Sequence, residues 1–310
     1  MPHLKVFGRF LAVSSQLMLK HRRWLDDELF LQAAYRGLLN RDPDADGLDY
    51  YQNRLQRGSL SRLGVLQSII QSSEFKQVAG LPVHPLLALH QSRMQLIRHH
   101  LPQADIIVDL GGASIGNPEG ALLAMGYPHR LQKVMIIDLP PDDRLYGDRG
   151  AEKAQSYTTP DGVTVQYFYS SMTDMSPLAD ASVDFVWSGE SIEHISEADG
   201  DIVCREAYRV LKPGGYFCLD TPNGRLTRIQ SPDEFIHPEH QKEYLVHELQ
   251  EKVVKWGFEL LETRGICHMP QTVQSGHFDQ REMAFNMGLF DEAEECYLFY
   301  LKARKPYLEE

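Results

Sequence analysis

Two acidic residues and a histidine in the second half of the chain have the residue types needed to remove a proton. Glu193 and His194 are adjacent, and Asp220 ends the next strongly apolar run. Imidazole titrates near neutral pH and a carboxylate can orient it, so these residues are candidates for general base catalysis. A Glu-His pair that only packs and orients a loop would explain Glu193 and His194 as well.

A glycine-containing turn follows an apolar run that ends at Asp109. The turn holds Gly111, Gly112 and Gly116, and glycines at such a place let the backbone approach a ligand closely. The carboxylate of Asp109 suits an ammonium group, whereas it would repel a pyrophosphate. The turn therefore favours a ligand such as S-adenosylmethionine (SAM), whose methionine part carries an amino group, over a dinucleotide.

A second carboxylate, Asp138, ends the next apolar run, 133–137. In a parallel sheet it would lie at the carboxyl edge beside the turn after Asp109, where it could accept hydrogen bonds from two ribose hydroxyls. A strand-end aspartate that caps a turn is the alternative interpretation.

The pattern of apolar residues predicts the fold that positions these groups. From residue 104 onward, short apolar runs alternate with helical stretches, which is typical of a doubly wound α/β sheet. The expected strands cover 106–110, 134–138, 163–169, 183–187 and 215–219, with closing strands near 258–267 and 296–303, and the expected helices cover 117–126, 197–211 and 242–257.

The first part of the chain has a different pattern, with apolar residues at helical spacing between about 24 and 80. It predicts three short helices and a domain boundary near 80, giving domains 1–80 and 81–310. The segment 41–47 places Asp42, Asp44 and Asp46 at calcium-loop spacing, but Asn53 stands where the bidentate glutamate is needed. We therefore expect a polar turn in which Asp46 caps the second helix.

Two family resemblances follow from longer motifs. The run YRGLLNRDPDADGLDYYQNRLQRGSLSR, with VLQSIIQSSEF after it, resembles the domain of unknown function DUF4214. The runs SVDFVWSGESIEHI and EAYRVLKPGGYF resemble class I SAM-dependent methyltransferases of the ubiquinone-biosynthesis and sugar O-methyltransferase type, over about 104–304. The second resemblance implies a Rossmann-like α/β fold with a mixed seven-stranded sheet, preceded here by a small all-α domain.

The methyltransferase resemblance also implies roles for individual residues. Asp109 and the glycines would line the methionine end of SAM, Asp138 would bind the ribose, and His194 would be the base, with Glu193 and Asp220 as its acidic partners. The remaining cofactor residues would be Ser171 and Met172 at the adenine, and Ser188 and Gly189 beneath the sulfonium.

Three positions depart from the family pattern. Ala113 and Ile115 replace glycines, and Ser171 replaces an acid. They motivate a second hypothesis, a binding or scaffold protein on a methyltransferase fold that has lost catalysis. Retention of Asp109 and Asp138 argues against it, because a chain that no longer binds SAM has no physical need for charged strand ends.

The acceptor is expected to bind to the connection after the fifth strand. Asn223 opens this connection, and His237 and His240 follow with Glu239 between them. Their polarity favours a polyhydroxy acceptor, and no complete set of metal ligands is readable, so no metal is predicted. The resemblance points to a hydroxyl of a saccharide or glycolipid made for bacterial surface polysaccharide as the methyl acceptor.

Composition restricts the partners. Lys and Arg number 31 against 43 Asp and Glu, a net charge of −12 in 310 residues, which would repel nucleic acid. Four scattered cysteines indicate a reducing compartment, so we expect a cytoplasmic protein. The basic, partly apolar segment near 4–24 is a candidate for contact with a membrane surface or a partner protein.

Overall fold

The computed structural model describes residues 26–79, 84–114, 116–143 and 156–307. The chain divides into two compact units, 1–87 and 88–310, whereas the sequence placed the boundary near 80. The basic segment near 4–24 lies outside the described residues. Within them, no helix is both long enough and apolar enough to cross a membrane.

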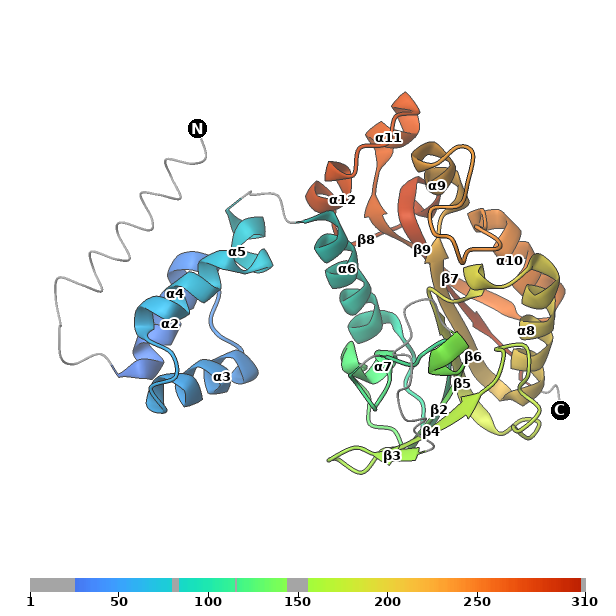
Figure 1. Cartoon of the computed structure of the whole chain (residues 1–310), viewed down its shortest axis with the longest axis horizontal. Coiled ribbons are helices and arrows are strands. Elements are labelled where there is room, and N and C mark those ends of the chain that lie inside the picture. Colours follow the sequence, from blue (N-terminus) through green and yellow to red (C-terminus); the bar gives the residue numbers. More distant parts are fainter. Residues whose placement is uncertain (1–25, 80–83, 115, 144–155, 308–310) are drawn as a thin grey trace. The chain divides into compact units, whose positions relative to one another are not determined.

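In its described residues the smaller unit contains helices and no strands (Figure 1). Four helices form where three were expected, because Ser72 adopts an extended conformation after α4 and its hydroxyl accepts a hydrogen bond from Phe75 N at 3.1 Å, at the start of α5. Buried apolar side chains from α2, α4 and α5 form the core of this unit. The helices are α2 (Asp27–Leu39), α3 (Ala45–Gln56), α4 (Arg62–Gln71) and α5 (Ser73–Val78).

The acidic turn between α2 and α3 is held by contacts within the protein. Asp44 is the N-cap of α3 and accepts a hydrogen bond from Gly47 N at 2.7 Å, so the expectation that Asp46 caps this helix is wrong. Asp42 pairs with Arg36. The carboxylates thus serve the turn itself, as in the polar-turn interpretation.

The larger unit is built on one nine-stranded sheet, with strand order β3-β4-β2-β1-β5-β6-β9-β7-β8. Strands β4, β2, β1, β5 and β6 are parallel, and β9 runs antiparallel between β6 and β7. The strands are β1 (Ile106–Leu110), β2 (Lys133–Asp138), β3 (Ser156–Thr158), β4 (Thr164–Tyr169), β5 (Val183–Gly189), β6 (Leu211–Pro222), β7 (Glu259–His268), β8 (Leu289–Phe290) and β9 (Cys296–Arg304).

The seven long strands confirm the Rossmann-like mixed sheet expected from the sequence. The two extra strands, β3 and β8, pair antiparallel with β4 and β7. They are three and two residues long, which is too short for apolar alternation to reveal them.

Helices cover both faces of the sheet (Figure 1). Side chains of β1 and β6 alternate between two apolar clusters, because successive residues of a strand point to opposite faces. One cluster includes α8 and α10, and the other includes α6, α7, α9 and α12. The helices are α6 (Pro85–His100), α7 (Ala121–Ala124), α8 (Glu197–Val210), α9 (Gly224–Gln230), α10 (Val246–Lys255), α11 (Pro270–Ser275) and α12 (Arg281–Phe285).

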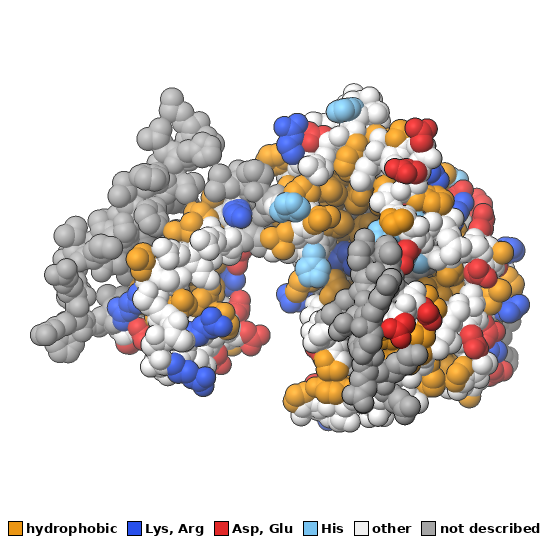
Figure 2. All heavy atoms as spheres, in the orientation of Figure 1, with side chains coloured by type: hydrophobic (Ala, Val, Ile, Leu, Met, Phe, Trp, Pro, Cys, Tyr) orange, Lys and Arg blue, Asp and Glu red, His pale blue; other side chains and the backbone are white. Residues whose placement is uncertain are grey.

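Helix α7 is shorter than the expected 117–126, because Gly120 has φ +87° and the helix begins only after it. The surface of the larger unit carries small groups of acidic side chains with Lys and Arg scattered among them (Figure 2), in keeping with the net charge of −12. The carboxyl ends of the parallel strands share one edge of the sheet, which is where ligands bind in open α/β folds.

The capping contact in the smaller unit gives a first prediction. Asp44→Ala removes the side-chain acceptor for Gly47 N, a loss of about 1 kcal/mol for an N-cap. Amide hydrogen exchange in α3 of the full chain should therefore speed up by roughly fivefold. Asp46→Ala is the matched control and should leave exchange in α3 nearly unchanged; equal effects of the two variants would contradict the assignment.

Candidate active site at the carboxyl edge of the sheet

A cavity of about 740 Å³ lies at the carboxyl edge of the parallel strands. Such a volume is in the range of small-molecule sites. Loops after β1, β2, β4 and β5 line it, together with the connection 231–245 between α9 and α10. The lining residues are Gly111, Ala113, Ile137, Asp138, Leu139, Ser171, Met172, Glu190, Ser191, Glu193, His194, Ile195, His237, Pro238, Glu239, His240 and Gln241.

The loop after β1 packs so closely against Ser191 and Asp109 that two of its positions require glycine. A Cβ on Gly111, which has φ +74°, would lie 2.7 Å from the Cβ of Ser191. A Cβ on Gly112 would lie 2.0 Å from a carboxylate oxygen of Asp109. The glycines therefore let the backbone cover Asp109 while Gly111 stays at the cavity wall.

Asp109 is buried under this loop, with 2% of its surface exposed, and does not itself line the cavity. Its Oδ2 atom has no hydrogen-bond partner among the described residues. Burial, together with the charge of Asp138, raises the pKa of Asp109 to about 8. A buried carboxylate with an unsatisfied oxygen is suited to pair with a cationic group.

Asp138 combines both roles considered for it. Its oxygens accept hydrogen bonds from Ala113 N at 2.9 Å and Leu139 N at 2.7 Å, so it caps the turn. It also lines the cavity, and a carboxylate oxygen can accept more than one hydrogen bond. The carboxylate is thus placed to shape the loop after β1 and to bind hydroxyls.

The other predicted cofactor residues divide into two groups. Ser171 and Met172 line the cavity. Ser188, Gly189 and Gly116 are not among the lining residues: the Ser188 hydroxyl lies 2.7 Å from that of Ser191, a Cβ on Gly189 would collide with the indole of Trp187, and Gly116 is exposed.

Glu193 and His194 belong to a short 3-10 helix, Ile192–His194, after β5. The buried side chain of Glu193 accepts a hydrogen bond from the Thr221 hydroxyl at 2.9 Å. Burial, aided by the charge of Glu190, raises the pKa of Glu193 well above its usual value. Burial lowers the pKa of His194, with His240 adding to the effect. His194 is therefore a neutral imidazole that can accept a proton.

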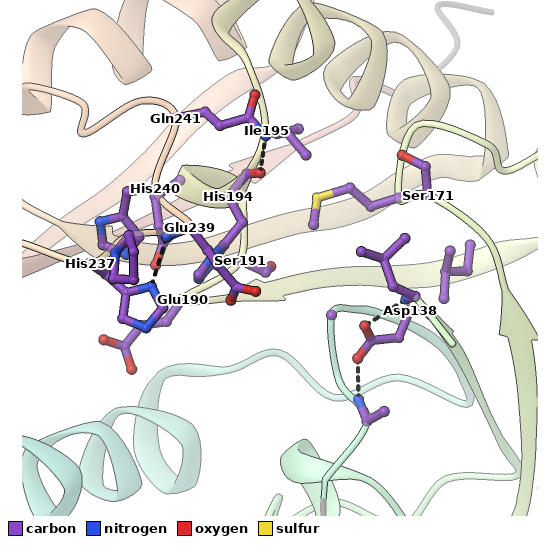
Figure 3. Close-up of a pocket in the computed structure, with 17 residues that line it drawn as sticks. Asp138, Ser171, Glu190, Ser191, His194, Ile195, His237, Glu239, His240 and Gln241 are labelled. Atoms are coloured by element: carbon purple, nitrogen blue, oxygen red, sulfur yellow. Dashed lines mark hydrogen bonds between the residues drawn. The ribbon is translucent and has the colours of Figure 1, made fainter. Parts of the chain in front are cut away.

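The structure brings His194 together with His237 and His240 (Figure 3). The ring centroid of His194 lies 5.6 Å from that of His237 and 5.0 Å from that of His240, and the latter two rings are 5.3 Å apart. In Figure 3 the histidines lie with Glu190 and Glu239 at one side of the cavity, and Asp138 and Ser171 lie at the other.

Two predicted site residues are engaged elsewhere. Asp220 is fully buried, and its two oxygens bind the Arg93 guanidinium at 2.6 and 3.0 Å. Asn223 caps α9 by accepting a hydrogen bond from Arg225 N, and its amide donates to three backbone carbonyls between 293 and 296. Neither residue lines the cavity, and both fix the ends of the elements around it.

Comparison with known proteins agrees with this geometry. Residues 116–219 match the model of a methyltransferase domain, and residues 11–79 match the domain of unknown function DUF4214. A probable S-adenosylmethionine-dependent methyltransferase of Mycolicibacterium smegmatis is 40% identical over 92 residues, 30% of this chain and 35% of that protein. The chain carries a SAM-dependent methyltransferase domain.

Other similar proteins align with this chain over similar fractions of their length. A dimethylglycine N-methyltransferase of Parasynechococcus marenigrum is 31% identical over 122 residues, which is 39% of each chain. The chain thus spans less than half the length of these curated relatives. A solved structure described as a SAM-dependent methyltransferase, possible histamine N-methyltransferase, from Thermotoga maritima has a TM-score of 0.49 at 16% identity, covering 71% of this chain and 91% of that one.

The residues of the methyltransferase domain fit SAM as its cofactor. Asp138 lines the cavity and suits the ribose hydroxyls, and the unpartnered Oδ2 of Asp109, under the backbone of Gly112, would suit the ammonium group. Apolar side chains of Ile137, Leu139 and Met172 also line the cavity and suit the adenine ring.

Sequence reasoning missed several residues of the site. Glu190 stands three residues before Glu193 in the motif SVDFVWSGESIEHI. Its place in this motif could have identified it as a site residue. Arg93 binds Glu190 at 2.5 Å as well as Asp220, but its helix also carries Arg98 and three histidines, so the sequence did not single it out. Ser191, whose hydroxyl donates to Leu110 O at 2.8 Å and so joins β1 to the loop after β5, was also missed.

The shifted pKa of Asp109 predicts how pH affects the stability of the SAM-free protein. Between the ordinary aspartate pKa of 3.8 and about 8, the unfolded chain has lost a proton that the folded protein keeps. Stability should therefore fall as pH rises to about 8 and then level off. Asp109→Asn removes this term, so at pH 7.5 the variant should be more stable by on the order of a few kcal/mol.

Urea denaturation at pH 5 to 9 without SAM would measure this difference. Asp105→Asn, at an exposed position beside the start of β1, is the control and should follow the wild-type profile. A constant difference between Asp109→Asn and wild type across this range would contradict the shifted pKa.

The buried ion pair predicts a second effect on stability. Arg93→Met leaves Asp220, which is fully buried, without its cation, and should lower the free energy of unfolding by about 3–5 kcal/mol. The double variant Arg93→Met, Asp220→Asn should recover most of this loss, because the fully buried charge is gone and Glu190, whose side chain is 32% exposed, can still be solvated. Urea denaturation would test both; a double variant as unstable as the single one would refute this account.

Proposed function

We propose that the protein transfers the methyl group of SAM to a hydroxyl of a small polar molecule, with saccharides or glycolipids of bacterial surface polysaccharide as the preferred class. One observation carries the proposal. A single cavity joins cofactor-type residues, Gly111 and Asp138, to a polar end with His194 and the other two histidines. A donor and an acceptor can therefore bind side by side.

In this reaction the protein has two main tasks, to position the acceptor beside SAM and to remove a proton. SAM supplies a methyl group on a positively charged sulfur; the C–S bond breaks as the new O–C bond forms. The protein must hold the acceptor oxygen about 3 Å from the methyl carbon and provide for loss of the hydroxyl proton. We assign removal of this proton to His194, because its lowered pKa favours the neutral ring and the residue lines the cavity.

The polar end of the cavity suits an acceptor with several hydroxyls. Glu190, Glu239 and Gln241 line it beside the histidines, and carboxylates and amides accept hydrogen bonds from hydroxyl groups. The Gln241 amide also donates to the His194 carbonyl at 2.9 Å, which ties the acceptor side of the cavity to the loop after β5.

The scaffold hypothesis receives less support. Ala113, one of the departures from the family pattern, donates its backbone N–H to Asp138 at 2.9 Å. The loop is thus still shaped around the carboxylate that would bind ribose. A scaffold without cofactor would gain nothing from keeping Asp109 buried with its pKa raised to about 8.

Calorimetric titration of the full chain with SAM and with NAD tests the cofactor. Micromolar SAM binding without a response to NAD is expected, and Asp109→Ala should abolish it because the ammonium group loses its counter-charge. Silence toward both ligands would favour the scaffold hypothesis. Normal SAM affinity in Asp109→Ala would refute the assigned role of the loop after β1.

Turnover tests the acceptor side. With saccharide and glycolipid acceptors, His194→Ala should lower the rate of S-adenosylhomocysteine release by about 10²–10⁴-fold while leaving SAM affinity nearly intact. His277→Ala, at an exposed position that does not line the cavity, is the matched control. Equal losses of SAM affinity and turnover in His194→Ala would point to a structural role.

A further inference from the structure

We propose that His194, His237 and His240 bind one divalent transition-metal ion at the acceptor end of the cavity. One ligand-type nitrogen from each residue lies within 4.8 Å of the others. Three protein ligands with an open position toward a cavity are the arrangement of catalytic zinc sites. The sequence alone predicted no metal, because only His237 and His240 were near each other along the chain.

The ligands come from two segments that are fastened to each other. His194 ends the 3-10 helix after β5, while His237 and His240 belong to the connection 231–245 (Figure 3). The Glu193 carbonyl accepts hydrogen bonds from Gln241 N at 2.8 Å and Lys242 N at 3.2 Å. The backbone therefore holds the three rings together without help from an ion, which is what a preorganised site requires.

His240 has the orienting partner typical of a metal ligand. Its Nδ1 lies 2.9 Å from Oε1 of Glu243, a buried side chain that also accepts a hydrogen bond from Ile236 N. A carboxylate oxygen accepts this hydrogen bond from Nδ1–H in the tautomer that leaves the Nε2 lone pair for a metal. Metal-bound histidines almost always donate their other ring N–H to a carboxylate or carbonyl in this way.

His237 likewise presents an unprotonated nitrogen. Its Nδ1 accepts a hydrogen bond of 3.2 Å from the backbone N–H of Glu239, so this nitrogen carries a lone pair. At 3.2 Å this hydrogen bond lies at the long end of the usual range. His194 contributes the third ring from the opposite segment.

The charges around the three rings favour a cation. Glu190 and Glu239 line the same cavity, and Asp220 accepts a hydrogen bond from Glu190 N at 2.9 Å. Arg93 pairs with Asp220 and Glu190, which leaves the described part of the site with more carboxylates than cations. Imidazole ligands select zinc and similar transition metals, whereas magnesium and calcium prefer oxygen.

The ion would deepen the proposed function, and its catalytic part rests on that function. An acceptor hydroxyl bound to the open position of the metal loses its proton more easily. The proton passes to water, the oxygen forms the new bond to the methyl carbon, and the C–S bond of SAM breaks. His194 then serves as a ligand of the metal ion and does not itself take the proton.

Metal titration of the untagged full chain, freed of ions by chelation, tests the site. Zn²⁺ and Co²⁺ should bind with one equivalent per chain, Co²⁺ with the visible absorption of a low-coordinate site, and Mg²⁺ should not compete. His237→Ala and His240→Ala should weaken binding by more than about 100-fold, and Glu243→Gln by about 10–100-fold. His277→Ala, with an exposed histidine outside the cavity, should bind as wild type does.

SAM titration of each variant provides the control for folding, because the predicted SAM residues do not include these histidines. Failure of wild type to bind one ion, or equal binding in wild type and His240→Ala, would overturn the proposal. Unchanged methyl transfer by the metal-free protein would overturn the catalytic role of the ion and leave the proposed function intact. Metal binding without methyl transfer to any acceptor would overturn the proposed function but support the site.

Discussion

The site depends on one buried cation. Arg93, on the helix that precedes the sheet, binds Asp220 at the end of β6 and Glu190 just after β5. The Asp220 carboxylate in turn accepts a hydrogen bond from Glu190 N at 2.9 Å. This network fixes the ends of two central strands, and therefore the short helix that carries Glu193 and His194. The cavity therefore depends on an ion pair, Arg93–Asp220, whose residues do not line it.

The sequence was sufficient for most of the fold. The central strands are continuous apolar runs, as expected for strands buried on both faces, and the motifs around Glu193 and at the junction of α8 and β6 identified the family. The sequence was insufficient to predict contacts that join distant parts of the chain. Asp220 resembles a catalytic acid at a strand end, and only the structure shows that Arg93, 127 residues earlier, occupies it.

The same limit applies to the histidines. Spacing along the chain suggested that His237 and His240 act together, and family resemblance suggested a base at His194. Their meeting depends on hydrogen bonds between the Glu193 carbonyl and the backbone of residues 241 and 242. Backbone contacts of this kind leave no trace in residue types, because any non-proline residue can donate them.

Those backbone contacts also bear on how acceptor choice can diverge among related proteins. The path of the connection 231–245 is fixed partly by main-chain groups, at Glu193 and at the Tyr244 carbonyl, which accepts from Gly224 N at 2.8 Å. Side chains at cavity positions such as Pro238 and Glu239 can therefore be exchanged without redirecting the chain. A lineage could alter the molecules it recognises by point substitutions here, while the cofactor half of the cavity stays as it is.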